Sequence, residues 1–598
     1  MMRRTLCLAL AAVLISSLTA CGLFSSAGAE DAARAFAAAY GDPAAAAQLT
    51  DAPKAAEAAL RQAKQALDAE DVQVAVEDVT EADGAATAGF TVTWKLPDDR
   101  TWRYQTEAEL VPHGDGWQVR WTPAVLHPKL AAQHTLAVET ETPELAPVLD
   151  RSGANVLEPG YVVSIMLYPD EARQSGGVHT VAKSLAASLK RFDRTITERS
   201  ILAAARKATG KNASTVVAVL REHDYQSVKP AIYDLPGVKF VRQTRLLPPS
   251  RDLGSQLLPA IRTLVTDRVT GEAGWRVVAK DSLGAEVAEL HRVDPKPAKA
   301  VQTTISLDVL RAAEKAVDRE RKPAALVALQ PSSGGILAVA QNEAADKQGA
   351  ISLIGRFPPG STFKMATALA ALRAGEVSPR SKVDCPGTTV IGGRLVPNEG
   401  RFQLGTVPLA QAFAKSCNTT FARLAARLPA DALTEAARDL GVGADFVIPG
   451  ITTITGSAPP SGSLVQRAEN GFGQGKVLAS PFGMALAAAT VRAGKTPVPT
   501  LVKGEKTKAT GLGRPLRKEH AAALRDMMRQ VVTQGTATAL RGLGPVHGKT
   551  GTAQFGDGKH SHGWFAGYRG DVAFAVLVVG GETSAPAVEI SKAFLAGL

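Results

Sequence analysis

The stretch 358–364 reads Pro-Pro-Gly-Ser-Thr-Phe-Lys and precedes a run of good helix formers, residues 365–372. The Pro-Pro-Gly turn predicts a helix start, and Gly375 supplies a stop. Ser361 then lies at the helix N-terminus and shares a face with Lys364, three residues further on. A hydroxyl beside an amine is a nucleophile with its base, provided that burial or neighbouring cations lower the pKa of the amine. The stretch therefore predicts a nucleophilic serine with a lysine as its base.

A second short motif, Ser416-Cys417-Asn418, lies between two helical patterns. Residues two apart do not share a helix face, so Ser416 and Asn418 can both reach one site only from a turn between helices. There the hydroxyl can relay a proton and the amide can bind a peptide carbonyl. Cys417 is expected to serve packing or a disulfide, not nucleophilic attack.

A third motif, Lys549-Thr550-Gly551-Thr552, has the β-branched and glycine residues of a strand. Alternation puts Thr550 and Thr552 on one face, and Gly551 lets a ligand backbone approach closely. An edge strand here could pair with an extended peptide, and its backbone N–H could serve an oxyanion. Lys549 and the threonine hydroxyls could hold a carboxylate. Each of the three motifs occurs once, and all fall in one domain.

The N-terminus has the features of an export signal. Arg3-Arg4 precede an apolar run, 6–18, that is too short to span a bilayer comfortably. The run ends in Leu-Thr-Ala-Cys-Gly, residues 18–22, which resembles a bacterial lipobox with Cys21 as the lipidated residue. An ordinary signal peptide or a short anchor is the alternative. Residues 1–21 are expected to be a lipoprotein signal peptide. The mature protein would then lie outside the cytoplasm, anchored by lipid to the outer face of the cytoplasmic membrane.

Length, charge and cysteine content further limit the classes of protein to which the chain can belong. A chain of 598 residues predicts two to four domains. The net charge of +11 is spread along the chain, which suits anionic surfaces and gives no reason to expect nucleic acid. Export would permit a disulfide between Cys385 and Cys417, but the sequence leaves open whether they pair. No metal-ligand spacing occurs, so no metal or other cofactor is expected.

Three folded parts are predicted after the signal. Helical patterns and then alternating strands, with turns at 97–99 and 113–116, predict a small cone-like α+β domain over 22–145. The less regular segment 146–300 carries no catalytic constellation and ends near a Pro-rich boundary. Strands at both ends of 301–598, with helices between them, predict a mixed sheet joined by its termini plus a helical lobe. The expected fold class is multidomain α+β.

The three motifs together resemble the active-site signature of penicillin-binding proteins and serine β-lactamases. Six further stretches narrow the resemblance to class B, monofunctional penicillin-binding proteins: 147–153, 271–275, 356–361, 471–475, 480–485 and 564–568. The pattern over 94–121 is similar to the nuclear-transport-factor-like N-terminal extension of methicillin-resistance-type members. The lipobox and the absence of an Arg-Gly pair before Ala146 depart from the family pattern. The resemblance identifies 146–300 as a pedestal or dimerisation domain and 301–598 as a transpeptidase domain.

The resemblance implies a D,D-transpeptidase that cross-links peptidoglycan stem peptides through an acyl-serine and is acylated by β-lactams. Ser361 would attack the penultimate D-Ala carbonyl, Lys364 would take the proton and Ser416 would help to shuttle it. The remaining motif residues would bind the substrate: Asn418, Lys549, Thr550, Gly551 and Thr552. The implied partners are stem peptides, β-lactam antibiotics and a separate glycan polymerase.

Two alternatives stay open. A D,D-carboxypeptidase or β-lactamase would use the same serine but release the acyl group to water. A non-catalytic β-lactam-binding scaffold would be expected to lose motif residues, whereas all three motifs are intact.

Overall fold

The structure, a computed structural model, describes residues 28–598 except 211 and 557. The chain divides into two compact units. Unit 1 combines the described residues up to Pro143 with Glu272–Lys296, and unit 2 combines Glu144–Gly271 with Pro297–Leu598. The lipobox and Cys21 lie outside the described residues. Within the described part of the chain, every helix is too short or too polar to cross a membrane.

Unit 1 is a curved antiparallel sheet with helices packed on it, as the sequence predicted. Its helices are α1 (Ala29–Ala39), α2 (Pro43–Ala47), α3 (Pro53–Ala66) and α4 (Pro123–Leu126). Its main sheet has the order β1 (Asp71–Ala82), β2 (Ala85–Leu96), β3 (Arg100–His113) and β4 (Gly116–Val119). Alternation on β2 buries Phe90 and Trp94, and the Phe36 ring of α1 meets Phe90 edge-on at 6.0 Å.

A second, three-stranded sheet completes unit 1 with residues that are distant in sequence. Strand β10 (Gly274–Lys280) pairs with β11 (Glu286–Val293) and, along its whole length, with β5 (Thr135–Glu141). Trp275 and Val277 join the hydrophobic core of unit 1. Residues 272–296, which the sequence placed inside the 146–300 segment, therefore pack with the N-terminal part. The limits of the pedestal domain stay a prediction.

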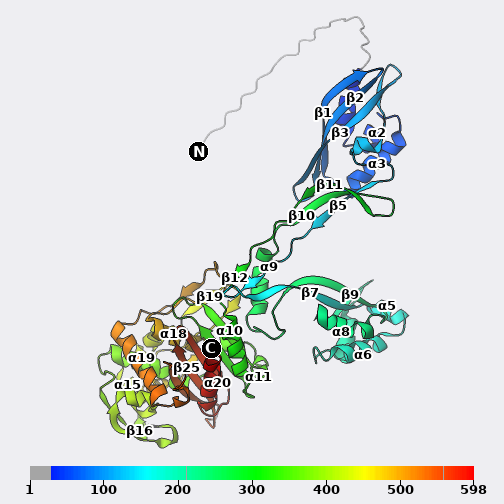
Figure 1. Ribbon diagram of the computed structural model, residues 1–598. Coiled ribbons are helices and arrows are strands. Elements are labelled where there is room, and N and C mark those ends of the chain that lie inside the picture. Colours follow the sequence, from blue (N-terminus) through cyan, green and yellow to red (C-terminus); the bar gives the residue numbers. More distant parts are fainter. Residues whose placement is uncertain (1–27, 211, 557) are drawn as a thin grey trace, which may run out of the picture. The chain divides into compact units, whose positions relative to one another are not determined.

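Unit 2 begins with a small lobe, residues 155–247, which we call the pedestal lobe (Figure 1). Its central strand β7 (Asn155–Leu167) pairs with β8 (Thr215–Arg221) on one side and β9 (Val238–Leu247) on the other. Alternate β7 residues, among them Val163 and Ile165, are buried in the core formed with the helices. Those helices are α5 (Pro169–Gln174), α6 (Val178–Leu189), α7 (Glu198–Lys207) and α8 (Glu222–Ile232). Helix α9 (Leu258–Val269) follows the lobe.

Asp150 joins the stretch 147–153 to the start of α10 (Leu307–Val317) within unit 2. Its Oδ1 accepts hydrogen bonds from Ser152 N (2.7 Å), Ser152 Oγ (2.6 Å) and Ala154 N (3.0 Å). Its Oδ2 accepts one from Leu307 N (3.2 Å), at the start of α10. Burial raises the pKa of Asp150, but these hydrogen bonds outweigh it and hold the pKa below its ordinary value. Nearby, β6 (Val148–Leu149) pairs in parallel with β12 (Val301–Gln302).

The predicted mixed sheet is present and is joined by the two ends of the domain. Its strand order is β14 (Ile336–Gln341), β13 (Ala324–Leu329), β26 (Val572–Val578), β25 (His560–Arg569) and β24 (His547–Phe555). Every residue of β13 is buried, so both faces of the sheet are covered. Helices α10 and α20 (Ala585–Ala596) pack together on the sheet, and α18 (Pro481–Ala493) packs on β13, β25 and β26. Strand β24 is an edge strand.

The helical lobe lies in sequence between β14 and β24. Its helices are α11 (Glu343–Asp346), α12 (Ile351–Ile354), η1 (Gly360–Phe363), α13 (Lys364–Arg373), η2 (Glu399–Arg401), α14 (Leu409–Ala414), α15 (Asn418–Arg427), α16 (Ala432–Asp439), α17 (Leu464–Asn470), α19 (Lys518–Thr533) and η3 (Thr538–Leu540). Its short strands are β15 (Lys382–Cys385), β16 (Thr388–Ile391), β17 (Arg394–Pro397), β18 (Gly405–Pro408), β19 (Asp445–Ile448), β20 (Ile451–Thr452), β21 (Gly456–Ser457), β22 (Leu478–Ala479) and β23 (Lys508–Thr510).

Removing the Asp150 carboxylate should destabilise unit 2. The Asp150→Ala variant leaves the backbone N–H groups of Ser152, Ala154 and Leu307 without their acceptor, which should cost about 1–3 kcal/mol. Thermal unfolding should show a lower midpoint. The control is Asp267→Ala, which changes an exposed aspartate of the same unit. Equal midpoints for the two variants would contradict the role given to Asp150.

Candidate active site

Ser361 sits where the 3-10 turn η1 runs into α13, so the predicted helix start is confirmed. Gly360 has a φ of +52°, and a Cβ there would lie 2.6 Å from Thr552 O. Its N–H donates to Gly473 O at 2.9 Å, and a Cβ on Gly473 would lie 1.9 Å from Gly360 O. Only glycines allow this close approach, which brings the serine up to strand β24 and to the 471–475 loop.

Lys364 is fully buried, and its amine is the centre of the site. Nζ lies 2.9 Å from Ser361 Oγ, 2.8 Å from Ser416 O, 2.6 Å from Asn418 Oδ1 and 3.3 Å from Ser416 Oγ. Burial lowers the pKa of Lys364 well below its ordinary value, the charge of Lys549 lowers it further, and Glu399 opposes both. The neutral amine that a general base requires is therefore favoured.

Ser416 and Asn418 occupy the predicted turn between two helices. Helix α14 ends at Ala414 and α15 begins at Asn418. Ser416 has a φ of +63°, the left-handed region that costs a non-glycine residue energy and that clusters at functional sites. This conformation lets both Ser416 and Asn418 turn toward Lys364, which residues two apart on one helix cannot do.

Lys549 approaches the same serine from β24. Its buried Nζ donates to Ser416 Oγ at 2.9 Å and to Thr550 O at 3.0 Å. Burial lowers the pKa of Lys549 to about 7, against the opposing charge of Glu399. The Ser416 hydroxyl thus lies between two amines, Lys364 and Lys549, in a position to pass a proton.

Two cavities open beside Ser361. The smaller, of about 300 Å³, is lined by Ser361, Ser416, Thr550 and Thr552, so the two threonines share a face as predicted. A Cβ on Gly551 would lie 2.8 Å from Pro359 O, so this glycine is needed for the close packing of β24 on the turn before Ser361. The larger cavity, of about 670 Å³, also contains Asn418 and runs along the loop 394–401.

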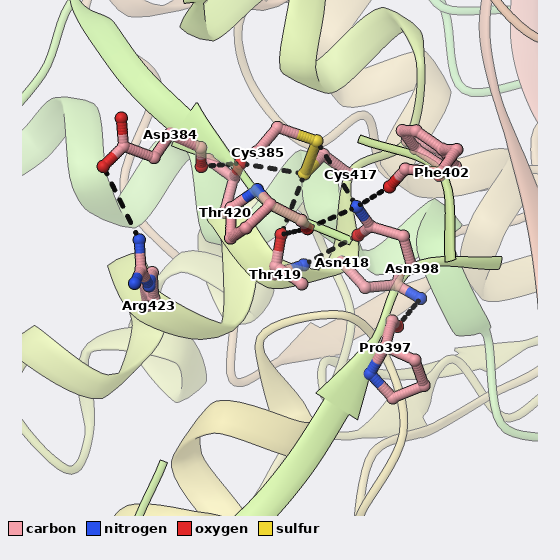
Figure 2. The surroundings of a disulfide bond; sticks show 12 residues. Asp384, Cys385, Pro397, Asn398, Phe402, Cys417, Asn418, Thr419, Thr420 and Arg423 are labelled. Carbon is pink, nitrogen blue, oxygen red and sulfur yellow. Dashed lines mark hydrogen bonds and ion pairs between the residues drawn. A yellow bond between two sulfur atoms is a disulfide. The ribbon is translucent and has the colours of Figure 1, made fainter. Parts of the chain in front are cut away.

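Cys385 and Cys417 form the disulfide that the sequence left open. Cys417 is the residue between Ser416 and Asn418, and Cys385 ends β15. Figure 2 shows the buried Asn398 beside the bond. Asn398 Nδ2 donates to Phe402 O at 2.8 Å, and its Oδ1 accepts from Thr419 N at 3.0 Å. The disulfide and the Asn398 amide therefore connect the segment 386–404, part of which lines the larger cavity, to the first turn of α15.

The sequence did not predict that several further residues contribute to the cleft. Thr536 Oγ1 lies 2.5 Å from Thr550 Oγ1, and Glu399 lines both cavities. Neither belongs to a motif that spacing would reveal. His562 is buried on β25 and stacks on Phe555 at 4.1 Å. His560 is exposed and pairs with Glu582. Among the described residues, no group of three metal-ligating side chains comes together.

Two family models match the chain. The model described as penicillin binding protein transpeptidase domain matches residues 324–596, and the one described as NTF2-like N-terminal transpeptidase domain matches residues 28–134.

Curated relatives bear similar names. Peptidoglycan D,D-transpeptidase PbpA of Mycolicibacterium smegmatis is 31% identical over 335 residues, which cover 47% of this chain and 67% of that protein. PbpA of Mycobacterium tuberculosis is 32% identical over 308 residues, 43% of this chain, and this chain spans only 62% of that protein's length. Penicillin-binding protein 3 of Bacillus subtilis is 23% identical over 521 residues, covering 76% of this chain and 75% of that protein.

Solved structures share the fold. Penicillin-binding protein PBP2 of Helicobacter pylori, solved in a complex with MreC, aligns with a TM-score of 0.57 at 17% identity, covering 77% of this chain and 98% of that one. A chain of a peptidoglycan synthase complex aligns with a TM-score of 0.55 at 22% identity, covering 78% and 91%. The fold class and the resemblance predicted from the motifs are confirmed: this chain belongs to the penicillin-binding proteins, with an NTF2-like domain ahead of its transpeptidase domain.

Proposed function

We propose that this chain is a peptidoglycan D,D-transpeptidase that works through an acyl-Ser361 intermediate. The observation that carries the proposal is the buried Lys364 amine, 2.9 Å from Ser361 Oγ, with its pKa lowered well below the ordinary value. A neutral amine at this distance can accept the serine proton as the hydroxyl attacks a carbonyl.

In the first half-reaction, Ser361 Oγ attacks the carbonyl of the penultimate D-Ala of a stem peptide, and its proton passes to Lys364. Backbone N–H groups of Ser361 and Thr552 would stabilise the oxyanion. The C–N bond then breaks, and the leaving terminal D-Ala takes the proton that Lys364 received, with the Ser416 hydroxyl, which contacts Lys364 and Lys549, as the relay. The product is a serine ester.

The donor peptide would lie along the outer edge of β24 by strand addition. Its terminal carboxylate fits the smaller cavity, beside the hydroxyls of Thr550 and Thr552 and near the Lys549 charge. Asn418 would hold the peptide from the opposite wall. A β-lactam with a carboxylate at the equivalent place would bind in the same manner and acylate Ser361.

In the second half-reaction, an amine of a neighbouring stem peptide attacks the ester and gives its proton to Lys364. An amide forms as the ester C–O bond breaks, and the Ser361 oxygen takes that proton from Lys364. The larger cavity, of about 670 Å³, provides room for such an acceptor, which favours cross-linking over hydrolysis. Hydrolysis, by a carboxypeptidase or a β-lactamase, is the second candidate because water could enter the same space. A non-catalytic scaffold is disfavoured because the base, relay and nucleophile are in contact.

We also propose that the protein is a lipoprotein on the outer face of the cytoplasmic membrane and works beside a separate glycan polymerase. The support is the lipobox before Cys21 and the likeness to a chain of a complex that coordinates polymerization and crosslinking. The intact mass of the N-terminal peptide from membrane extracts should show a diacyl adduct on Cys21, and its absence would refute lipidation.

Replacing the nucleophile should abolish acylation. Ser361→Ala removes the attacking oxygen, so fluorescent penicillin should no longer label the chain covalently. Ser332→Ala, in the turn between β13 and β14, is the matched control and should label normally. Labelling of another residue in the Ser361→Ala protein would overturn the assignment.

Transpeptidation and hydrolysis separate in one assay on the wild-type chain. A thioester stem mimic is supplied with and without a D-amino acid acceptor, and products are resolved by mass. Transpeptidation predicts an acceptor adduct, whereas release to water alone would favour the hydrolase.

The rate of acylation should depend on pH through Lys549, and this dependence should disappear when Lys549 is replaced. Above about pH 7 it loses the charge proposed to hold the carboxylate, so wild-type acylation by penicillin should slow toward pH 9. In Lys549→Met, acylation should be slow throughout, without this alkaline decline. An unchanged decline in the variant would remove Lys549 from the carboxylate site.

The pH dependence of thermal stability is a second measurement, and the lowered pKa of Lys549 determines its direction. The unfolded lysine has a pKa of about 10.4, above the folded value of about 7, so the unfolded chain binds the extra proton between these values. Wild-type stability should therefore rise with pH across this window. Lys549→Met should unfold at a higher temperature than wild type at pH 6, and the difference should shrink toward pH 10.

A further inference from the structure

A pocket in unit 2, remote in sequence from the three motifs, is lined by four arginines, three of which lack acidic partners in the part of the chain that the structure describes. It has a volume of about 550 Å³ and lies where β8 and β9 of the pedestal lobe meet the segment leading into α9. Four arginines and one aspartate line it: Arg221, Arg245, Arg251, Arg262 and Asp193. Its volume falls within the range of roughly 300–1,000 Å³ typical of ligand sites.

The acidic groups near the pocket are already engaged. Asp193 Oδ1 accepts from Thr195 N at 2.8 Å and from Thr195 Oγ1 at 2.7 Å. Arg251 pairs with Asp224 at 2.8 Å. Among the described residues, no carboxylate forms an ion pair with Arg221, Arg245 or Arg262, although unit 2 elsewhere pairs many of its arginines. Three guanidinium groups without an ion-pair partner among these residues therefore line the pocket, against the single carboxylate of Asp193.

Arg262 shows the cost of this arrangement. Its Nε is buried and has no hydrogen-bond partner. Burial lowers the pKa of the guanidinium, and the charges of Arg245 and Arg221 lower it further. A buried donor without an acceptor and unpaired like charges both destabilise a fold, and an anion bound at Arg262 would relieve both.

The remaining arginines are held in place. Arg221 Nη2 donates to Pro248 O at 2.7 Å, and Arg245 Nη2 donates to Gln243 Oε1 at 3.0 Å. Each guanidinium thus keeps other N–H groups for a ligand. We propose that this arginine pocket binds a phosphate group. A multiply charged oxyanion matches these three guanidinium groups better than a single carboxylate does, and arginine binds phosphate through paired N–H donors.

Apolar residues in the pocket wall limit the chemical type of the ligand further. Val162, Leu253 and Leu258 line the same pocket, so the ligand would be a phosphate ester or pyrophosphate with an adjoining apolar group. A phospholipid headgroup and a phosphate-bearing intermediate or polymer of the cell envelope share this chemistry. The proposal does not depend on the acyl-transfer function of Ser361.

Pyrophosphate is the probe for the test, on the full chain, by isothermal titration calorimetry and thermal unfolding. Wild type should bind it and gain thermal stability, beyond the effect of potassium chloride at equal ionic strength. Arg262→Met should bind on the order of tenfold more weakly. Without ligand it should be at least as stable as wild type, because a half-buried charge without an ion-pair partner among the described residues is gone. Arg245→Met, at an exposed residue, should weaken binding too.

Arg199→Met is the matched control, because Arg199 is an exposed arginine of the same lobe outside the pocket. It should bind pyrophosphate like wild type. A cooperative thermal unfolding transition in the absence of ligand checks that every variant is folded. Equal binding by Arg262→Met, Arg245→Met and wild type, or an equal effect of potassium chloride, would overturn the proposal.

Vesicles distinguish the sources of the phosphate. If phosphatidylglycerol vesicles compete with pyrophosphate in wild type, a lipid headgroup is the ligand. If pyrophosphate binding persists unchanged with vesicles, a soluble or polymeric phosphate is the ligand. Both outcomes support a phosphate site, whereas absence of pyrophosphate binding in wild type refutes it.

Discussion

The burial of one amine, that of Lys364, is the constraint on which the site depends. An exposed lysine would carry a proton at neutral pH and could not act as a base. Here Nζ is surrounded by Ser361, Ser416 and Asn418 and excluded from water, while Lys549 adds a second positive charge nearby. Removing solvent and adding a like charge both lower the pKa of Lys364, so the fold favours the neutral amine that its proposed role as a base requires.

Holding two buried amines together requires rigid supports from distant parts of the chain. The edge strand β24 brings Lys549, the start of α13 brings Ser361 and Lys364, and the turn before α15 brings Ser416. Contacts between glycine backbones, such as Gly360 with Gly473, make the closeness possible. The large sheet core therefore does more than stabilise the domain. Its favourable free energy of folding offsets the cost of burying charge at the edge of the sheet.

The sequence predicted the elements whose information is local. The helix start at Ser361 and Lys364 forms where the sequence predicted it, and the terminal strands pair as expected. The motifs predicted the contact between Ser361 and Lys364 because three residues along a helix fix it. Non-local pairings could not be predicted from the sequence. Nothing near Trp275 indicates that β10 pairs with β5, and nothing near Asn398 indicates its contact with Thr419. The pairing of Cys385 with Cys417 likewise depends on how β15 meets α15.

The disulfide ties catalytic competence to the place where the chain folds. Its two cysteines are 32 residues apart, and one of them lies between Ser416 and Asn418, so the segment 386–404 and the proposed proton relay share one cross-link. A reducing cytosol would keep both thiols free, and the turn that presents Ser416 in a left-handed conformation would lose its covalent support. Chains that fold before export, or recombinant chains made inside the cell, would then differ from the native protein at the centre of the site while sharing its overall architecture.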